Sequence, residues 1–293
     1  MHFLCILAIF KNEDVILKEW LDHYIAEGVD HFYLIDNGST RPYTHLIEPY
    51  MNRITLVVDP AHGQQVALYN RMMDFREKEM EWLLVCDLDE FVYGTKCSLA
   101  DFMHTINDPT VGAIQVPWLM FGSSGHIEQP SSVVQGFRWR KRDRHPLFKS
   151  IVRPKALQYF HVHQHALRDG YTSLEVDARS EDAIAAAPLR LNHYAIQSLN
   201  WFREVKLTRG DAMGNDSARD DKYFENYDHK EVYDDSLAIK RTVKKREHEH
   251  EHEHEHEREH HESDSDTSIE ALFWTLLPLV PLAAYGLYRL VRR

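Results

Sequence analysis

Two aspartates separated by one residue, Asp87 and Asp89, are the clearest candidates for chemistry in this sequence. They follow the apolar run 82–86, which we interpret as a buried strand. Side chains alternate along an extended segment, so both carboxylates are expected to point the same way, with Cα atoms about 6–7 Å apart. Such oxygen ligands suit one Mg²⁺ or Mn²⁺ ion, which stabilises a diphosphate leaving group. The alternative is that these acids only end a strand and cap a turn.

The elements that must position these acids alternate along the first part of the chain. A continuous apolar run, typical of a strand buried on both faces, occupies residues 3–10, and further strands are expected at 32–35, 54–58 and 82–86. Helical patterns fill the gaps after Asn12, which is expected to cap the first helix, and over residues 64–80. Gly28 is expected to stop the first helix. The pattern predicts an α/β fold with a mostly parallel sheet flanked by helices.

In such a sheet, ligands bind beyond the carboxyl ends of the strands. The sequence therefore predicts one polar rim made of residues 11–13, 36–39, 62–65 and 87–90.

Several blocks of sequence carry a resemblance to a known family. They are residues 10–13 (FKNE), 19–24 (EWLDHY), 32–39 (FYLIDNGS), 87–91 (DLDEF), 118–126 (WLMFGSSGH), 148–154 (FKSIVRP) and 191–194 (LNHY) with Ser198. In this order, over roughly residues 3–212, they resemble the family-92-like and related family-2-like glycosyltransferases. The resemblance implies a GT-A fold (the nucleotide-diphospho-sugar transferase fold), a nucleotide-sugar donor and a divalent metal ion.

The resemblance also implies roles for single residues. It puts Lys11, Glu13 and Asp36 near the base and ribose of the donor, and Gln65 near the donor as well. It makes Asp87 and Asp89 the ligands of a Mn²⁺ or Mg²⁺ ion. GT-A enzymes commonly add a histidine from the second half of the chain, for which the candidates are His193 and His163.

The second half of the chain leaves several assignments open. Residues 157–165 (LQYFHVHQH) are interpreted as a strand that carries three histidines, His163 among them, on one face. His126 lies in a glycine-rich loop and is expected near the donor sugar or the acceptor, although an ordinary turn explains the loop equally well. Inversion at the anomeric carbon requires a base, and Glu128 and Asp143 are suggested for it by position alone.

Composition limits the classes of function. A formal net charge of −12 argues against a nucleic-acid partner, because phosphates require a basic surface. The three cysteines have no metal-ligand spacing, and Cys5 and Cys86 lie in apolar runs as small hydrophobes. The apolar start of the chain lacks a basic segment and a cleavage site, so it is interpreted as a strand rather than a signal peptide.

Four regions are expected along the chain. Residues 1–212 form the GT-A domain, 213–246 a polar and partly helical extension, 247–268 a disordered His/Glu and acidic linker, and 269–291 a transmembrane anchor. A single-pass anchor at this end would leave the catalytic domain cytosolic, although the terminal arginines argue weakly for the reverse orientation.

The sequence thus favours a metal-dependent glycosyltransferase that moves a sugar, with inversion, to a hydroxyl of a glycan or glycoprotein. Two alternatives stay open. One is an α/β nucleotidyltransferase that uses the same aspartates on a nucleoside triphosphate. The other is a non-catalytic, membrane-tethered protein whose His/Glu segment binds metal.

Overall fold

The computed structural model describes residues 1–210, 212–214 and 219–243. The chain divides into two compact units, Met1–Ala238 and Ile239–Arg293, and the first contains the sheet with the helices that pack on it. Its strands are β1 (His2–Phe10), β2 (His31–Asp36), β3 (Ile54–Val58), β4 (Met80–Val85), β5 (Glu90–Gly94), β6 (Val111–Met120), β7 (Trp139–Arg140), β8 (Phe148–Val152), β9 (Leu157–Tyr159), β10 (Ala166–Leu167), β11 (Thr172–Glu175), β12 (Leu189–His193) and β13 (Val232–Tyr233).

The helices are mostly short. They are α1 (Asp14–Ala26), α2 (Thr44–Ile47), α3 (Gln65–Met73), α4 (Leu99–His104), α5 (Val133–Gly136), α6 (Glu181–Ala186), α7 (Leu199–Trp201) and α8 (Asp221–Tyr227), with 3-10 turns η1 (Glu48–Arg53) and η2 (Pro154–Ala156) and a π-helical turn η3 (Phe202–Lys206).

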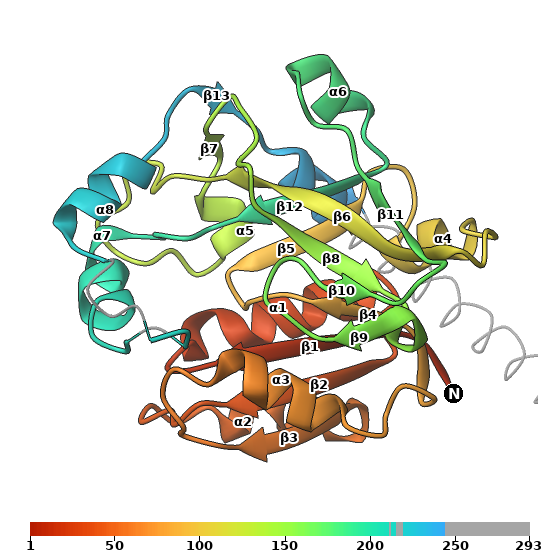
Figure 1. The fold of residues 1–293 in the computed structure, drawn as a ribbon. Coiled ribbons are helices and arrows are strands. Elements are labelled where there is room, and N and C mark those ends of the chain that lie inside the picture. Colours follow the sequence, from red (N-terminus) through yellow and green to blue (C-terminus); the bar gives the residue numbers. More distant parts are fainter. Residues whose placement is uncertain (211, 215–218, 244–293) are drawn as a thin grey trace, which may run out of the picture. The chain divides into compact units, whose positions relative to one another are not determined.

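Nine strands of the described residues form one mixed sheet in the order β3-β2-β1-β4-β8-β6-β12-β5, with β11 beside β6 (Figure 1). The first four strands pair in parallel, which confirms the predicted strand–helix series. Strand β8 then runs antiparallel between β4 and β6, and β5 runs antiparallel to β12. The fold is therefore α/β, with a sheet of mixed direction.

Strand β1 is buried on both faces because alternate side chains pack on different helices. Leu4, Ile6 and Ala8 belong to a core that includes the inner face of α1. Cys5, Leu7 and Ile9 belong to a second core that includes the inner face of α3. The two helices therefore cover opposite faces of the sheet, and the carboxyl ends of the parallel strands stay uncovered between them.

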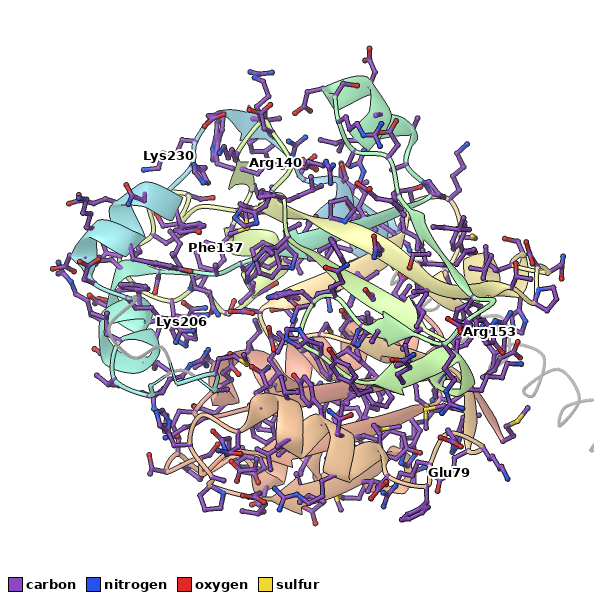
Figure 2. The ribbon with its side chains drawn as sticks, in the orientation of Figure 1. Glu79, Phe137, Arg140, Arg153, Lys206 and Lys230 are labelled. Carbon is purple, nitrogen blue, oxygen red and sulfur yellow. The ribbon has the colours of Figure 1, made fainter. Side chains whose placement is uncertain are left out.

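The segment after β12 is part of the same compact unit. Strand β13 pairs with β7, and the buried Arg140 donates hydrogen bonds to Asp234 at 2.8 Å and to Glu181 at 2.7 Å (Figure 2). Helix α8 packs its Phe224 on Phe202 of η3. The unit therefore continues to Ala238, past residue 212, where the sequence predicts the domain to end.

Three local predictions differ from the structure. Helix α3 ends at Met73 rather than at residue 80, and Phe75 soon after it has a left-handed φ of 64°. Asn12 does not cap α1; its own φ is 56°, and its side-chain oxygen accepts from the backbone N–H of Thr40 at 2.8 Å. Only Leu157–Tyr159 of the predicted histidine-bearing strand is extended, because the chain then turns and the His161 N–H donates to His165 Nδ1 at 3.0 Å.

No helix among the described residues has both the length and the apolar character needed to cross a membrane. The predicted linker at 247–268 and anchor at 269–291 lie outside the described residues.

Candidate active site

Asp87 and Asp89 lie in a tight turn between β4 and β5, not in the extended segment that the sequence suggests. The turn is closed by a hydrogen bond from the Glu90 N–H to the Asp87 carbonyl at 3.2 Å. Helix α1 holds this turn in place, because Trp20 Nε1 donates to the carbonyls of Asp87 and Glu90, each at 3.2 Å. Tyr24 Oη donates to the Glu90 carbonyl at 3.0 Å. The aromatic residues of α1 therefore set the backbone on which the acids sit.

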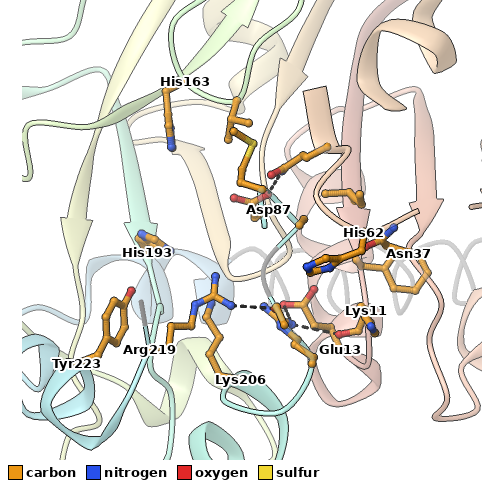
Figure 3. A pocket seen from close by; sticks show the side chains of 18 of the residues that line it. Lys11, Glu13, Asn37, His62, Asp87, His163, His193, Lys206, Arg219 and Tyr223 are labelled. Atoms are coloured by element: carbon orange, nitrogen blue, oxygen red, sulfur yellow. Dashed lines mark hydrogen bonds and ion pairs between the residues drawn. The ribbon is translucent and has the colours of Figure 1, made fainter. Parts of the chain in front are cut away.

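A pocket of about 240 Å³ opens at the carboxyl ends of the parallel strands, as the sequence predicts. Its lining comes from the ends of β1, β2 and β4, from the start of α3, and from β6, β12, η3 and α8. Figure 3 shows Asp87 between two groups of side chains, with Asn37 and His62 on one side and His193 and Tyr223 on the other. The polar and aromatic side chains of the lining include Lys11, Glu13, Asn37, His62, Gln65, Asp87, Trp118, His163, His193, Lys206, Arg209, Arg219, Tyr223 and Tyr227.

Asp87 faces this pocket and is held by a lysine. Its Oδ2 accepts from Lys149 Nζ of β8 at 2.8 Å, and its Oδ1 accepts from Gln65 Nε2 at 3.4 Å. Lys149 is fully buried, and its ammonium also lies 3.4 Å from Glu90 Oε2. Burial alone would raise the pKa of Asp87, but the Lys149 charge holds that pKa below its ordinary value. Asp87 is therefore a carboxylate at neutral pH.

Asp89 lies deeper, with 3% of its side chain exposed. Its Oδ2 accepts from Lys206 Nζ of η3 at 2.5 Å, and its Oδ1 lies 3.5 Å from His193 Nε2 at the end of β12. Burial would raise the pKa of Asp89, yet Lys206 and His193 together hold it well below the usual range. The charge of Asp89 is thus stabilised entirely by side chains from the second half of the chain.

Asp89, Glu90 and His193 form a buried group whose ligand atoms lie within 4.8 Å of one another. Two of their atoms, Glu90 Oε1 and His193 Nδ1, have no hydrogen-bond partner among the described residues. Burial raises the pKa of Glu90 well above its ordinary value, which is the opposite of what Asp89 shows. Two carboxyl groups, one imidazole and unpaired buried atoms form a donor set that fits a divalent cation. The group contains two of the predicted ligands, Asp89 and His193, together with Glu90; the predicted ligand Asp87 is not a member of it.

A second buried ion pair borders the pocket at the end of β1. Arg209 Nη1 lies 2.7 Å from Glu13 Oε1 and donates to the Lys11 carbonyl at 3.2 Å. Burial raises the pKa of Glu13, and Arg209 opposes that rise. Lys206 and Arg209 therefore bring two cationic side chains from one short segment to the pocket wall.

The structure brings some predicted residues to the pocket but not others. Lys11, Glu13, Gln65, His163 and His193 line it with Asp87. His163 is tied by Nδ1 to the Phe148 carbonyl at 3.1 Å, and it is not in the group with Asp89. Burial, reinforced by the Lys149 charge, lowers the pKa of His163 to about 4. Of the two histidine candidates, His193 therefore has the geometry of a metal ligand.

The other predicted residues, Asp89 among them, do not line the pocket. Asp36 is buried and accepts from Tyr43 Oη at 2.8 Å, so it supports the loop that holds Asn37. The His126 ring contacts the Gly136 carbonyl at 3.1 Å. Glu128 accepts from Asn200 Nδ2 at 2.6 Å, and Asp143 lines a separate hollow with Arg142 and Arg144. The geometry therefore lends no support to Glu128 or Asp143 as the base.

Three residues of the site are not predicted from the sequence: Lys149, Lys206 and Arg209. Glu90 belongs to the predicted rim but is not among the candidate ligands. Lys149 carries a usable signal, because a lysine inside the apolar run FKSIV must be paired when the strand is buried. Lys206 and Arg209 show no such signal in the sequence, because lysine and arginine in a helical segment ordinarily face solvent.

The protein-family model for glycosyltransferase family 92 matches residues 1–184. A glycosyltransferase family 92 protein of Ricinus communis is 29% identical over 215 residues, which cover 69% of this chain and 37% of that protein. A family 92 protein of Oryza sativa subsp. japonica is 25% identical over 215 residues, covering 69% of this chain and 35% of that protein. The chain thus spans a little over a third of the length of these curated relatives.

Among solved structures, the chain is similar to the crystal structure of S. aureus TarS residues 1–349. The identity is 13%, the match covers 66% of this chain and 60% of that one, and the TM-score is 0.37.

Proposed function

Because this chain belongs to glycosyltransferase family 92, we propose that it is a metal-dependent transferase with a GT-A fold. It moves a sugar from a nucleotide-diphosphate donor to a hydroxyl of a glycan or glycoprotein. The observation that supports this proposal most directly is that Asp87 and His193 line a pocket beyond the carboxyl ends of parallel strands, with the buried Asp89 directly behind His193. In α/β sheets this is where ligands bind.

The two ends of the pocket suit the two parts of the reaction. One end carries Lys11, Asn37 and His62, which are polar groups that suit a nucleotide. The other end carries Trp118, Tyr223 and Tyr227, and the rings of Tyr223 and Tyr227 stack with centroids 4.5 Å apart. Aromatic rings offer a flat apolar surface with a polar edge, which suits the apolar face of a sugar ring. We assign the first end to the donor nucleotide and the second to the sugars.

Asp89, Glu90 and His193 would hold the metal ion, with Asp87 beside them. When bound, a divalent cation supplies Lewis-acid stabilisation of negative charge on the departing diphosphate. The chain's own cations assist in the same place, because Lys206 and Arg209 line the pocket beside the acids. Trp20 and Tyr24 hold the turn, so the acids keep their positions while substrates exchange.

The proposal is tested by incubating the full chain with a panel of common sugar nucleotides and Mn²⁺, with and without candidate glycans. The expected product is a nucleoside diphosphate, released slowly by hydrolysis and faster when an acceptor is present. Asp87→Asn should abolish the release, whereas Asp143→Asn is a matched control that should not. Normal turnover in Asp87→Asn would remove the site from the mechanism.

We further propose that residues 269–291 anchor the chain in a membrane, with the catalytic domain on the cytosolic side. The support is the uncharged run 271–288, close to the length that a helix needs to span a bilayer. Flotation of the full chain with lipid vesicles, compared with a chain shortened at residue 243, tests the anchor. Equal flotation of both chains would exclude it.

A further inference from the structure

Each aspartate of the turn already carries a lysine ammonium. Lys149 Nζ lies 2.8 Å from Asp87 Oδ2, and Lys206 Nζ lies 2.5 Å from Asp89 Oδ2. The partly buried Asp87 and the buried Asp89 are therefore charge-compensated by the protein itself. A divalent cation that binds Asp89 must enter beside Lys206 and compete with it for the same carboxylate.

The two lysines are anchored differently. Lys149 projects from a strand in the middle of the sheet, has no exposed side chain, and lies between Asp87 and Glu90. Lys206 is the last residue of the π-helical turn η3 and belongs to the pocket wall. The partner that the structure gives its ammonium is Asp89. Single π-helical turns are frequent at functional sites. Lys206 is thus the lysine that is able to exchange partners within the pocket.

The charges around Lys206 favour such an exchange. Arg209 lies on the same segment and pairs with Glu13 at 2.7 Å, and Arg219 also lines the pocket. A divalent cation adds two positive charges next to this basic group, which repels an ammonium that has lost its carboxylate. The diphosphate of a donor brings negative oxygens to the same pocket, and an ammonium is a good point-charge partner for them.

We propose that Lys206 is the counter-charge of Asp89 before a divalent cation binds, and that it transfers to the donor diphosphate when the cation takes Asp89. This inference rests on the proposed function, since it requires both a metal and a diphosphate. Lys206 is then a positioning residue that makes metal and donor binding cooperative: each ligand relieves a charge imbalance that the other creates.

The test uses the full chain and two separate probes. The first is Mn²⁺ alone, titrated without nucleotide and followed by electron paramagnetic resonance of the free ion. Lys206→Met should bind Mn²⁺ more tightly than the wild type, by about tenfold or more, because the competing ammonium is gone. The second probe is UDP, and then GDP, at saturating Mn²⁺. The nucleotide that the wild type binds should bind the variant about tenfold or more weakly.

The control is Lys230→Met, which removes an exposed lysine paired with Asp228 at 3.2 Å (Figure 2). It should change neither binding constant. If Lys206→Met does not fold, Lys206→Gln replaces it, because it keeps a hydrogen-bond donor toward Asp89. It should likewise bind Mn²⁺ more tightly and the nucleotide more weakly than the wild type. Lys206→Arg keeps the charge and should bind Mn²⁺ as the wild type does.

The outcomes separate this inference from the proposed function. If the neutral variants bind Mn²⁺ no more tightly than the wild type, the competition does not exist and the inference is overturned. If their Mn²⁺ affinity rises but their nucleotide affinity is unchanged, the transfer to the diphosphate is overturned. If the wild type binds no Mn²⁺ at all, the metal site itself fails, and this inference fails with it.

Discussion

Replacing Lys149 with methionine keeps an unbranched apolar side chain, one heavy atom shorter, while removing the charge. The variant leaves the Asp87 carboxylate without the ammonium that lies 2.8 Å away in the native protein. It also removes the charge next to Glu90, whose side chain is fully buried. The native burial of Lys149 means that no water molecule compensates this loss from the lysine side.

The expected loss of stability follows from the pairing. Removing one partner of a buried ion pair costs about 3–5 kcal/mol, and the lower end, about 3 kcal/mol, applies because water reaches Asp87. Asp87 has 31% of its side chain exposed. For a domain of this size, that loss corresponds to a melting temperature lower by about 6–12 °C.

The pH dependence has a definite sign. In the native protein the pKa of Asp87 is held down by Lys149 against burial, so its stabilising effect is present above the unfolded-state pKa and is lost only in strong acid. Without Lys149, burial raises the carboxyl pKa values, and folding then takes up protons as the pH falls. The stability deficit of Lys149→Met should therefore be largest near about pH 7 and should shrink toward about pH 5.

The assay is thermal unfolding followed by circular dichroism at both pH values. Glu90→Gln is the first control and should cost about 1 kcal/mol or less, since burial already favours the neutral form of Glu90 and the amide oxygen still accepts from the Asp87 N–H. The double variant Lys149→Met/Asp87→Asn removes both charges and should recover most of the loss. Native-like stability of Lys149→Met alone, or losses that simply add in the double variant, would refute this reasoning.

Three further predictions concern the metal-side acid, a glycine and the aromatic end of the pocket. Asp89→Asn should abolish nucleoside diphosphate release and lower stability by about 3 kcal/mol, because it leaves Lys206 buried without its carboxylate. The double variant Asp89→Asn/Lys206→Met should regain the stability but not the activity. Restored turnover in the double variant would contradict the assignment of Asp89. Gly28→Ala should cost about 2–4 kcal/mol in urea unfolding, because φ is +88° and the new Cβ would lie 2.5 Å from Ala100 Cβ. Gly170→Ala, with φ of +87° and nothing within 4 Å, should cost about 1 kcal/mol, and equal costs would show that the contact is irrelevant. Tyr223→Leu should raise the KM for the acceptor several-fold while the KM for the donor is unchanged, and a purely donor-side effect would reverse the assignment of the two ends.

The first half of the fold is predictable because its signals are local. Strands β1 to β4 are each built on a mainly apolar run, and polar residues follow β1, β2 and β4 at the edge where the pocket opens. Gly28 follows the end of α1 with a left-handed φ, as predicted. The pairing of β8 between β4 and β6 is not predictable in this way, since it joins segments about 65 residues apart in sequence.

The site, too, is predictable where the signal is local and unpredictable where it depends on distant segments. Asp87 and Asp89 stand out by spacing, but their conformation does not, because the turn depends on hydrogen bonds from Trp20 and Tyr24 in another element. In the sequence, those two aromatic residues are recognisable only as members of the apolar face of a predicted helix. Lys149 and Lys206 reach the aspartates from β8 and η3, and nothing local indicates which acid a distant lysine meets.

The most direct test of the account is the thermal stability of the full chain with Mn²⁺, with a nucleoside diphosphate, and with both together. A ligand that binds the native state raises its apparent stability. We expect one of UDP or GDP to raise the melting temperature strongly only when Mn²⁺ is present, and Asp89→Asn/Lys206→Met to lose this effect. A rise that is independent of Mn²⁺, or one that persists in the double variant, would contradict this expectation.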